Sequence, residues 1–155
     1  MSTWSTRTTT TGTPDEVIAV LTDPDAIRRW SPIDFRIEQL DSDRLAAGTR
    51  ARVSGRLAGR CPTFDVDVSA ADAGRFALTA SGPIEIEVEY EAFVAGPGEV
   101  ELWASLSVEG SGLLGRVLSQ ATSALLAAGA LDKALARIAG EVGARGSCRE
   151  LPLAA

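Results

Sequence analysis

The sequence contains no histidine. This excludes histidine metal ligands, the Ser-His-Asp and Cys-His catalytic arrangements, and the commonest general base near neutral pH. Two cysteines among 155 residues cannot form a four-cysteine zinc site, so we expect no metal site and predict no cofactor. Basic residues number 15 against 21 acidic ones, giving a net charge of −6. Nucleic-acid binding requires basic groups to neutralise phosphates, so it is not expected.

Long apolar runs are also missing. The nearest candidate for a membrane span, residues 113–135, is interrupted by Arg116, Gln120, Asp132 and Lys133. The first seven residues, MSTWSTR, lack the apolar run of a signal peptide. We therefore expect a cytoplasmic protein without a transmembrane segment, in which Cys61 and Cys148 are free thiols. The oligomeric state is not determined by the sequence, and a homodimer is left open.

The remaining composition is that of a globular domain, with 45% hydrophobic and 23% charged residues. A chain of this length can bury a substantial core as one domain, and it contains no internal repeat or linker. We predict a single domain over residues 1–145. Gly143 and Gly146 are expected to end its last helix, and residues 146–155 to form a flexible tail.

The first 30 residues predict one strand and two short helices. Residues 3–11, TWSTRTTTT, are rich in β-branched side chains and favour a strand. Thr13 and Pro14 supply an N-cap and a first helical residue for one helix. Asp23 supplies the cap of a second helix that reaches Trp30.

Residues 34–109 alternate apolar and polar side chains with a period of two, which predicts six further strands. Their breaks carry glycine or proline, and the short loops favour an antiparallel meander. From Leu114 to Val142 the apolar period returns to 3.6 residues, which predicts one long helix with a bend or close packing at Gly129. The fold class is α+β: a seven-stranded curved antiparallel sheet wrapped around a long C-terminal helix, with two short helices between strands 1 and 2.

Several short motifs carry a family resemblance: GTPDEV at 12–17, LTDPD at 21–25, Trp30, and GSGLLG at 110–115. With the order of elements, they resemble the START-like, or helix-grip (SRPBCC), superfamily. This superfamily includes birch-pollen-allergen-like proteins and the polyketide cyclase/dehydrase and lipid-transport families, and the chain looks like a small bacterial member. It is also similar to the branch of the superfamily that is named after carbon monoxide dehydrogenase. The resemblance implies a deep cavity between sheet and helix for an apolar or aromatic ligand, but it does not specify a reaction.

Inward-facing positions supply the candidate ligand-binding residues. Those outside the first strand are Trp30, Val53, Phe64, Phe76, Leu78, Val88, Tyr90, Leu102, Leu106, Leu118 and Leu125. Leu57, Val66, Ile86 and Leu114 share this register. A filled core is the alternative for all of them, although only 5% of the residues are aromatic, which favours unfilled space.

Three candidates come from the first strand, where the resemblance implies aliphatic residues. Thr6, Thr8 and Thr10 are inward by register. Their hydroxyls either orient an oxygen-bearing ligand, or face solvent or bond locally.

Other chemical groups allow two interpretations each. Tyr90 is a core residue, or it donates a hydrogen bond to a ligand carbonyl or acts as a general acid if its pKa is lowered. Trp30 packs the short helices on the sheet or gates the cavity. Arg28 and Arg29 are a solvated pair or attract an anionic ligand. The strand carboxylates belong to an exposed outer face, where Asp65 and Asp67 are placed to pair with arginines across a hairpin.

The function expected is therefore binding or transport of a small hydrophobic or aromatic ligand, such as a lipid, a quinone or a polyketide-like compound. A polyketide cyclase/aromatase-like enzyme is one alternative, with no catalytic residue identified beyond a role for Tyr90 or an inward arginine. A protein-interaction or toxin-like module on the same fold is another. Whether the chain is an enzyme is left open.

Overall fold

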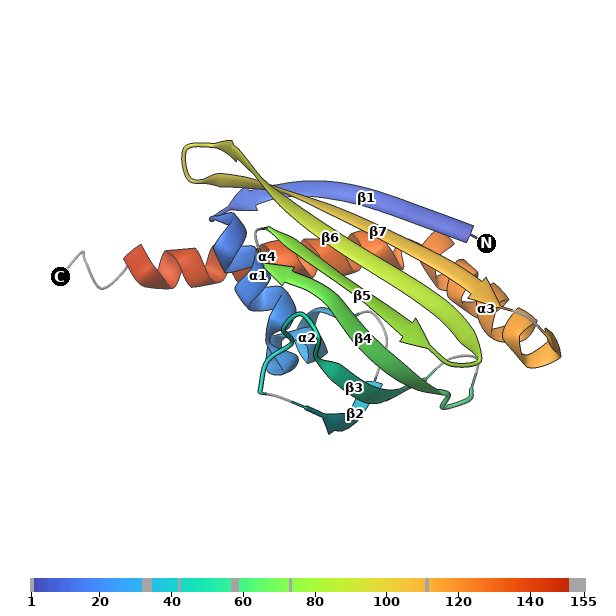
Figure 1. Cartoon of the computed structure of the whole chain (residues 1–155). Coiled ribbons are helices and arrows are strands. Elements are labelled where there is room, and N and C mark those ends of the chain that lie inside the picture. The colour runs from blue at the N-terminus through green and yellow to red at the C-terminus, as the bar shows by residue number, and fades with distance from the viewer. Residues whose placement is uncertain are drawn as a thin grey trace.

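The computed structural model describes residues 2–31, 35–41, 43–56, 59–72, 74–110 and 112–150. The elements follow in this order (Figure 1): β1 (Ser2–Thr11), α1 (Pro14–Thr22), α2 (Pro24–Trp30), β2 (Phe35–Leu40), β3 (Arg50–Gly55), β4 (Thr63–Asp72), β5 (Arg75–Ser81), β6 (Ile84–Gly96), β7 (Glu99–Gly110), α3 (Gly112–Ala127) and α4 (Ala130–Glu150). The predicted strand, two short helices, six strands and C-terminal helical region are confirmed.

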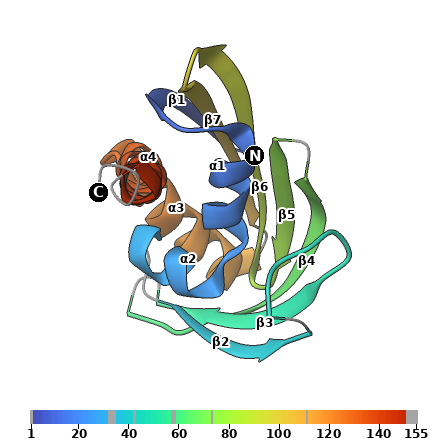
Figure 2. The same cartoon turned by 90° about the vertical axis from the view of Figure 1, so that its left-hand side faces the viewer.

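The strands form one antiparallel sheet in the order β1-β7-β6-β5-β4-β3-β2. The sheet curves around the helices, which lie on its concave side (Figure 2). Register shifts interrupt the pairing in β2, in β4 and in β6. Such bulges bend a strand and increase its twist, which allows a sheet of this width to curve around its contents.

Local capping explains where α1 and α2 begin. The Glu16 backbone N–H donates to Thr13 Oγ1 over 3.2 Å, and the Thr13 hydroxyl donates to Glu16 Oε1 over 3.2 Å. Asp23 ends α1 and caps α2, where its Oδ1 accepts from the Asp25 N–H at 3.0 Å. Each helix has proline in its first turn, where the missing N–H costs no hydrogen bond.

The structure divides the predicted long helix at Gly129, which has a φ of +93°. An L-residue with a side chain rarely adopts this left-handed backbone, so glycine closes α3 and turns the chain into α4. Gly143 and Gly146 do not end α4, because a glycine inside a helix weakens it without terminating it. The helix reaches Glu150, so the first half of the expected tail, residues 146–150, is helical. Residues 151–155 lie outside the described residues.

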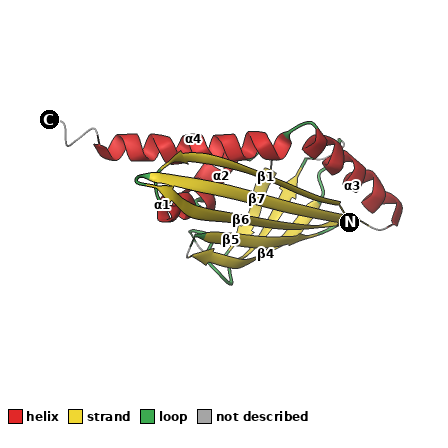
Figure 3. Cartoon of the chain, turned by 90° about the horizontal axis from the view of Figure 1, so that it is seen from above, coloured by secondary structure: helices red, strands yellow, loops and turns green. Residues whose placement is uncertain are grey.

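The densest part of the core lies where α1 and α4 pack against the sheet. Val17, Leu21, Leu135, Ile138 and Val142 are at most 1% exposed there. Figure 3 shows α4 running along the sheet, with α3 beyond its first turn. In the described part of the chain, we find no helix with the length and apolarity needed to cross a membrane.

Candidate functional site

Between the sheet and the helices lies unfilled space in two lobes of about 230 Å³ each. The α2 lobe lies between α2 and strands β2–β6, and the α3–α4 lobe lies between strands β5–β7 and the two C-terminal helices. Five residues line both lobes and form what we call the junction: Trp30, Ser31, Phe76, Leu78 and Ile86. Because the lobes share these residues, we treat them as two halves of one cavity.

Three aromatic side chains pack together here: Phe76 and Trp30 of the junction, and Tyr90 next to it. Phe76 on β5 and Tyr90 on β6 are register partners, which brings their rings into a stacked arrangement with centroids 6.4 Å apart. Trp30, the last residue of α2, stands edge-on to Tyr90 with centroids 5.8 Å apart. Trp30 therefore both packs α2 on the sheet and lines the cavity.

The cavity lining is almost entirely apolar. Among the residues that the structure describes, no aspartate, glutamate, lysine or arginine lines either lobe. The polar side chains in the lining are those of Trp30, Ser31, Tyr90 and Thr122. The Thr122 hydroxyl already donates to the Leu118 carbonyl over 2.8 Å. The site therefore offers apolar contact and a few hydrogen-bonding groups.

Tyr90 is the one lining residue with a resolved change in acidity. Its side chain is 4% exposed. Burial raises the pKa of Tyr90 well above its ordinary value, because the phenolate would be poorly solvated. The interpretation that a lowered pKa makes Tyr90 a general acid is therefore wrong. Its hydroxyl is neutral and suited to hydrogen bonding.

Most of the candidate residues lie on the cavity surface. Those that line one or both lobes are Trp30, Val53, Phe64, Phe76, Leu78, Val88, Tyr90, Leu106 and Leu125, joined by Val66 and Ile86 of the same register. Leu102 and Leu118 are fully buried in the packed core and line neither lobe. Leu114 is 43% exposed on α3, and Leu57 lies outside the described residues.

The lining also contains residues that the sequence analysis did not select. Among them are Ile27 and Ser31 at α2, Leu45 in the loop before β3, and Leu131 and Ala134 on α4. Ile27 precedes Trp30 by three residues, a helical spacing that identifies one face of α2. Leu45 has no such signal, because its loop has no periodicity. It is placed by its own N–H, which donates to the Thr22 carbonyl over 3.0 Å.

The first-strand threonines lie against α4 and not in the cavity. The Thr6 hydroxyl donates to Asp132 Oδ1, and the Thr10 hydroxyl donates to the Ala139 carbonyl over 3.0 Å. Thr8 is half-buried between them, and none of the three lines either lobe. The Thr6 and Thr10 hydroxyls thus hold the edge strand on α4 through bonds to residues distant in sequence, which is neither the expected ligand contact nor local bonding.

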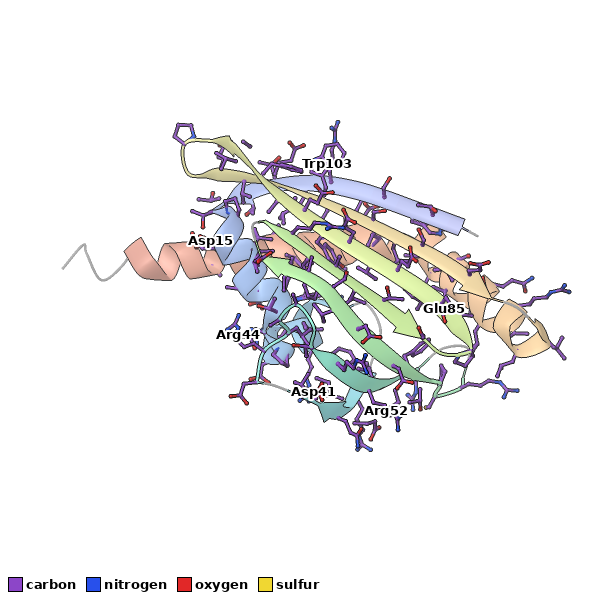
Figure 4. The ribbon with its side chains drawn as sticks, in the orientation of Figure 1. Asp15, Asp41, Arg44, Arg52, Glu85 and Trp103 are labelled. Atoms are coloured by element: carbon purple, nitrogen blue, oxygen red, sulfur yellow. The ribbon has the colours of Figure 1, made fainter. Side chains whose placement is uncertain are left out.

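Several charged side chains form ion pairs outside the cavity. Arg29 donates from Nε and Nη2 to the two carboxylate oxygens of Glu141 over 2.7 and 3.2 Å, and this hydrogen bonding raises its pKa. Arg50 pairs with Asp67 at 3.1 Å and Arg52 with Asp65 at 3.2 Å, as the predicted cross-strand pairing requires. Figure 4 shows Arg52 and Glu85 on the sheet side of the molecule, away from α4.

No family model and no curated protein matches this chain. Solved structures do match. The Zhui aromatase/cyclase from Streptomyces sp. R1128 has a TM-score of 0.69 at 17% identity, covering 93% of this chain and 94% of its own. A START superfamily protein from Mycobacterium smegmatis has a TM-score of 0.63 at 19% identity, covering 90% and 96%. Ara h 8.0201 has a TM-score of 0.56 at 15% identity, covering 88% and 97%.

The chain has the helix-grip fold. The predicted fold resemblance is confirmed over most of the chain. At these identities the likeness establishes the helix-grip architecture, and the chemistry must be argued from the cavity itself.

Proposed function

We propose that this helix-grip protein binds a small hydrophobic or aromatic molecule in the two-lobed cavity. The observation that carries the proposal is a void lined by apolar side chains and by no charged residue of the described chain. Apolar burial contributes about 25 cal/mol per Å² removed from water, so a ligand that fills such a void gains affinity without a specific ionic contact. Lipids, quinones and polyketide-like compounds belong to this class.

The cavity supports binding more directly than catalysis. Proton transfer needs a group whose pKa lies near the working pH. Tyr90 is the only titratable side chain among the described lining residues, and its pKa is raised by burial. The aromatase/cyclase among the structural neighbours is therefore a guide to the kind of ligand that this chain binds. It is a weaker guide to any reaction that the chain catalyses.

A packed interior beside an exposed apolar patch would favour the protein-interaction alternative, whereas open space lined by apolar side chains favours ligand binding. Transport between sites, a cytoplasmic location and a homodimer stay predictions. They do not enter the argument for binding.

Native mass spectrometry of the freshly purified full chain, followed by denaturing extraction, tests the proposal. Ala80→Leu places a larger side chain in the α3–α4 lobe, whereas Ala136→Leu makes the same change at an exposed position of α4. We expect a stoichiometric apolar compound, or an added neutral naphthalene, on the wild type and on Ala136→Leu, and much less on Ala80→Leu. Equal loading of all three proteins would place the ligand elsewhere.

A further inference from the structure

We infer that the ligand is uncharged and carries a hydrogen-bond acceptor, such as a ketone or quinone carbonyl oxygen, that accepts the indole N–H of Trp30. This inference rests on the proposed function and names the ligand class for the same cavity. It places the polar group of the ligand at the junction of the two lobes, with apolar parts in either lobe.

The indole N–H of Trp30 is a hydrogen-bond donor without a partner in the described part of the chain. The Trp30 side chain is 7% exposed, and its Nε1 is buried without a hydrogen-bond partner among the residues that the structure describes. Buried polar groups nearly always have a partner, because an unpaired one loses its water without compensation. Trp30 lines both lobes, so a ligand in either lobe lies beside this indole.

The chemistry of the indole decides which hydrogen-bonding role the ligand takes. An indole N–H is a donor and cannot accept, so its partner must be an acceptor. The neighbouring polar groups do not fill this role. Among the described residues neither Thr122 nor Ser31 accepts this N–H, since Trp30 Nε1 has no partner there. Tyr90 meets Trp30 through its ring and offers no acceptor to the indole N–H.

The uncharged lining of the cavity disfavours a charged ligand. With no charged side chain in the described lining, an ionised carboxylate or ammonium would enter an apolar site without a counter-ion. Transfer of an unpaired charge from water to such a site is strongly unfavourable. A neutral carbonyl satisfies the donor without this penalty, which favours ketones, quinones, esters and lactones over fatty acids and amines.

Three naphthalenes of similar shape test the need for an acceptor and the need for a neutral ligand separately. 2-Acetylnaphthalene is neutral with an acceptor, 2-ethylnaphthalene is neutral without one, and 2-naphthoate is an anion. For the wild type we expect the ketone to bind about three- to tenfold more tightly than the hydrocarbon, the range for one net hydrogen bond. We expect the naphthoate to bind at least about tenfold more weakly than the ketone, because its charge is unpaired.

Two variants locate the donor. Trp30→Phe keeps a ring but removes the N–H, and should reduce the ratio of ketone to hydrocarbon affinity to about one, since a single hydrogen bond is lost. Tyr90→Phe removes only a hydroxyl, and the ratio of ketone to hydrocarbon affinity should stay close to that of the wild type. Using the ratio cancels any general loss of affinity from loosened packing.

A measurement on the wild type keeps the test independent of whether Trp30→Phe folds. The chain has three tryptophans, so its indole N–H resonances can be assigned by replacing Trp4 and Trp103. The Trp30 resonance should move downfield with 2-acetylnaphthalene and not with 2-ethylnaphthalene, as expected for a newly formed hydrogen bond.

The outcomes distinguish the two proposals. If none of the three probes binds, the proposed function fails and this inference fails with it. If the hydrocarbon binds as tightly as the ketone, if the naphthoate binds best, or if the preference is lost in Tyr90→Phe and kept in Trp30→Phe, the cavity binds ligands but the inference is overturned.

Discussion

The ring of Tyr90 meets the ring of Trp30 at 74°, with centroids 5.8 Å apart, where helix α2 packs on strand β6. Edge-to-face aromatic pairs contribute about 0.5–1.5 kcal/mol beyond their area burial. This contact therefore holds the end of α2 on the sheet. It also brings Tyr90 together with the Trp30 indole, whose N–H has no partner among the described residues, on one cavity.

The raised pKa of Tyr90 predicts an alkaline loss of stability. The folded pKa lies above the unfolded value of about 10, so folding holds a proton that the unfolded chain releases. By linkage, this contribution to stability is complete below about pH 10 and is lost as the pH rises through the folded pKa. The free energy of unfolding of the wild type should therefore fall above pH 10 more steeply than that of Tyr90→Phe.

Ionisation of Tyr90 can be followed directly by ultraviolet absorbance, because Tyr90 is the only tyrosine in the sequence. The ultraviolet absorbance of tyrosinate should appear together with unfolding, as followed by circular dichroism on the same samples. Ionisation near pH 10 in a protein that is still folded would contradict the burial argument.

The turn between α3 and α4 predicts opposite effects for two glycine substitutions. Gly129 has a φ of +93°, so Gly129→Ala should destabilise the protein by about 1–2 kcal/mol through backbone strain. Gly140 lies inside α4 with no atom within 4 Å of an added Cβ, so Gly140→Ala should stabilise it by about 0.5–1 kcal/mol. Urea unfolding of both variants tests this pair. A stabilising Gly129→Ala would mean that the chain forms one continuous helix.

Unfilled and filled parts of the interior should respond differently to added volume. Ala80 lines the α3–α4 lobe, and Ala104 is 2% exposed in the packed core and lines neither lobe. Ala104→Leu should cost about 1–3 kcal/mol through overpacking, whereas Ala80→Leu should cost less or stabilise the protein. Calorimetric melting of the two ligand-free variants provides the comparison. Equal losses of stability in Ala80→Leu and Ala104→Leu would show that the α3–α4 lobe is not an open space.

The ion pair between Arg29 and Glu141 joins α2 to α4 beside the cavity. Glu141→Gln should lower the melting temperature more than Glu101→Gln, a matched loss of charge on the sheet. The difference should shrink as salt is added, because exposed ion pairs are screened. A salt-independent difference would point to packing as its cause.

Local signals made the fold predictable. Thr13 and Asp23 cap their helices through contacts with residues two or three positions along the chain. Such short-range contacts can be predicted from the sequence. Strand alternation and hairpin spacing likewise predicted the pairing of Arg52 with Asp65. The division of the C-terminal helical region at Gly129 was harder to predict from the sequence. A glycine permits a left-handed turn, but packing determines whether the chain takes one.

The cavity was predictable only in part, because an inward register does not separate a void from a core. Leu102 and Leu106 share the inward face of β7, yet Leu102 is fully buried in packed side chains and Leu106 lines a lobe. The difference depends on where α1 and α4 pack. For the same reason the inward threonines of β1 contact α4, since that helix and not the void lies opposite them.

The most direct test of the account is a methyl NMR titration of the full chain with 2-ethylnaphthalene, which reports where an apolar ligand binds. We predict shifts for methyl groups of the cavity, such as those of Leu78, Ile86 and Leu131, and none for exposed Val94 and Leu113. Shifts confined to the exposed residues, with the cavity methyls unchanged, would contradict ligand binding between the sheet and the helices.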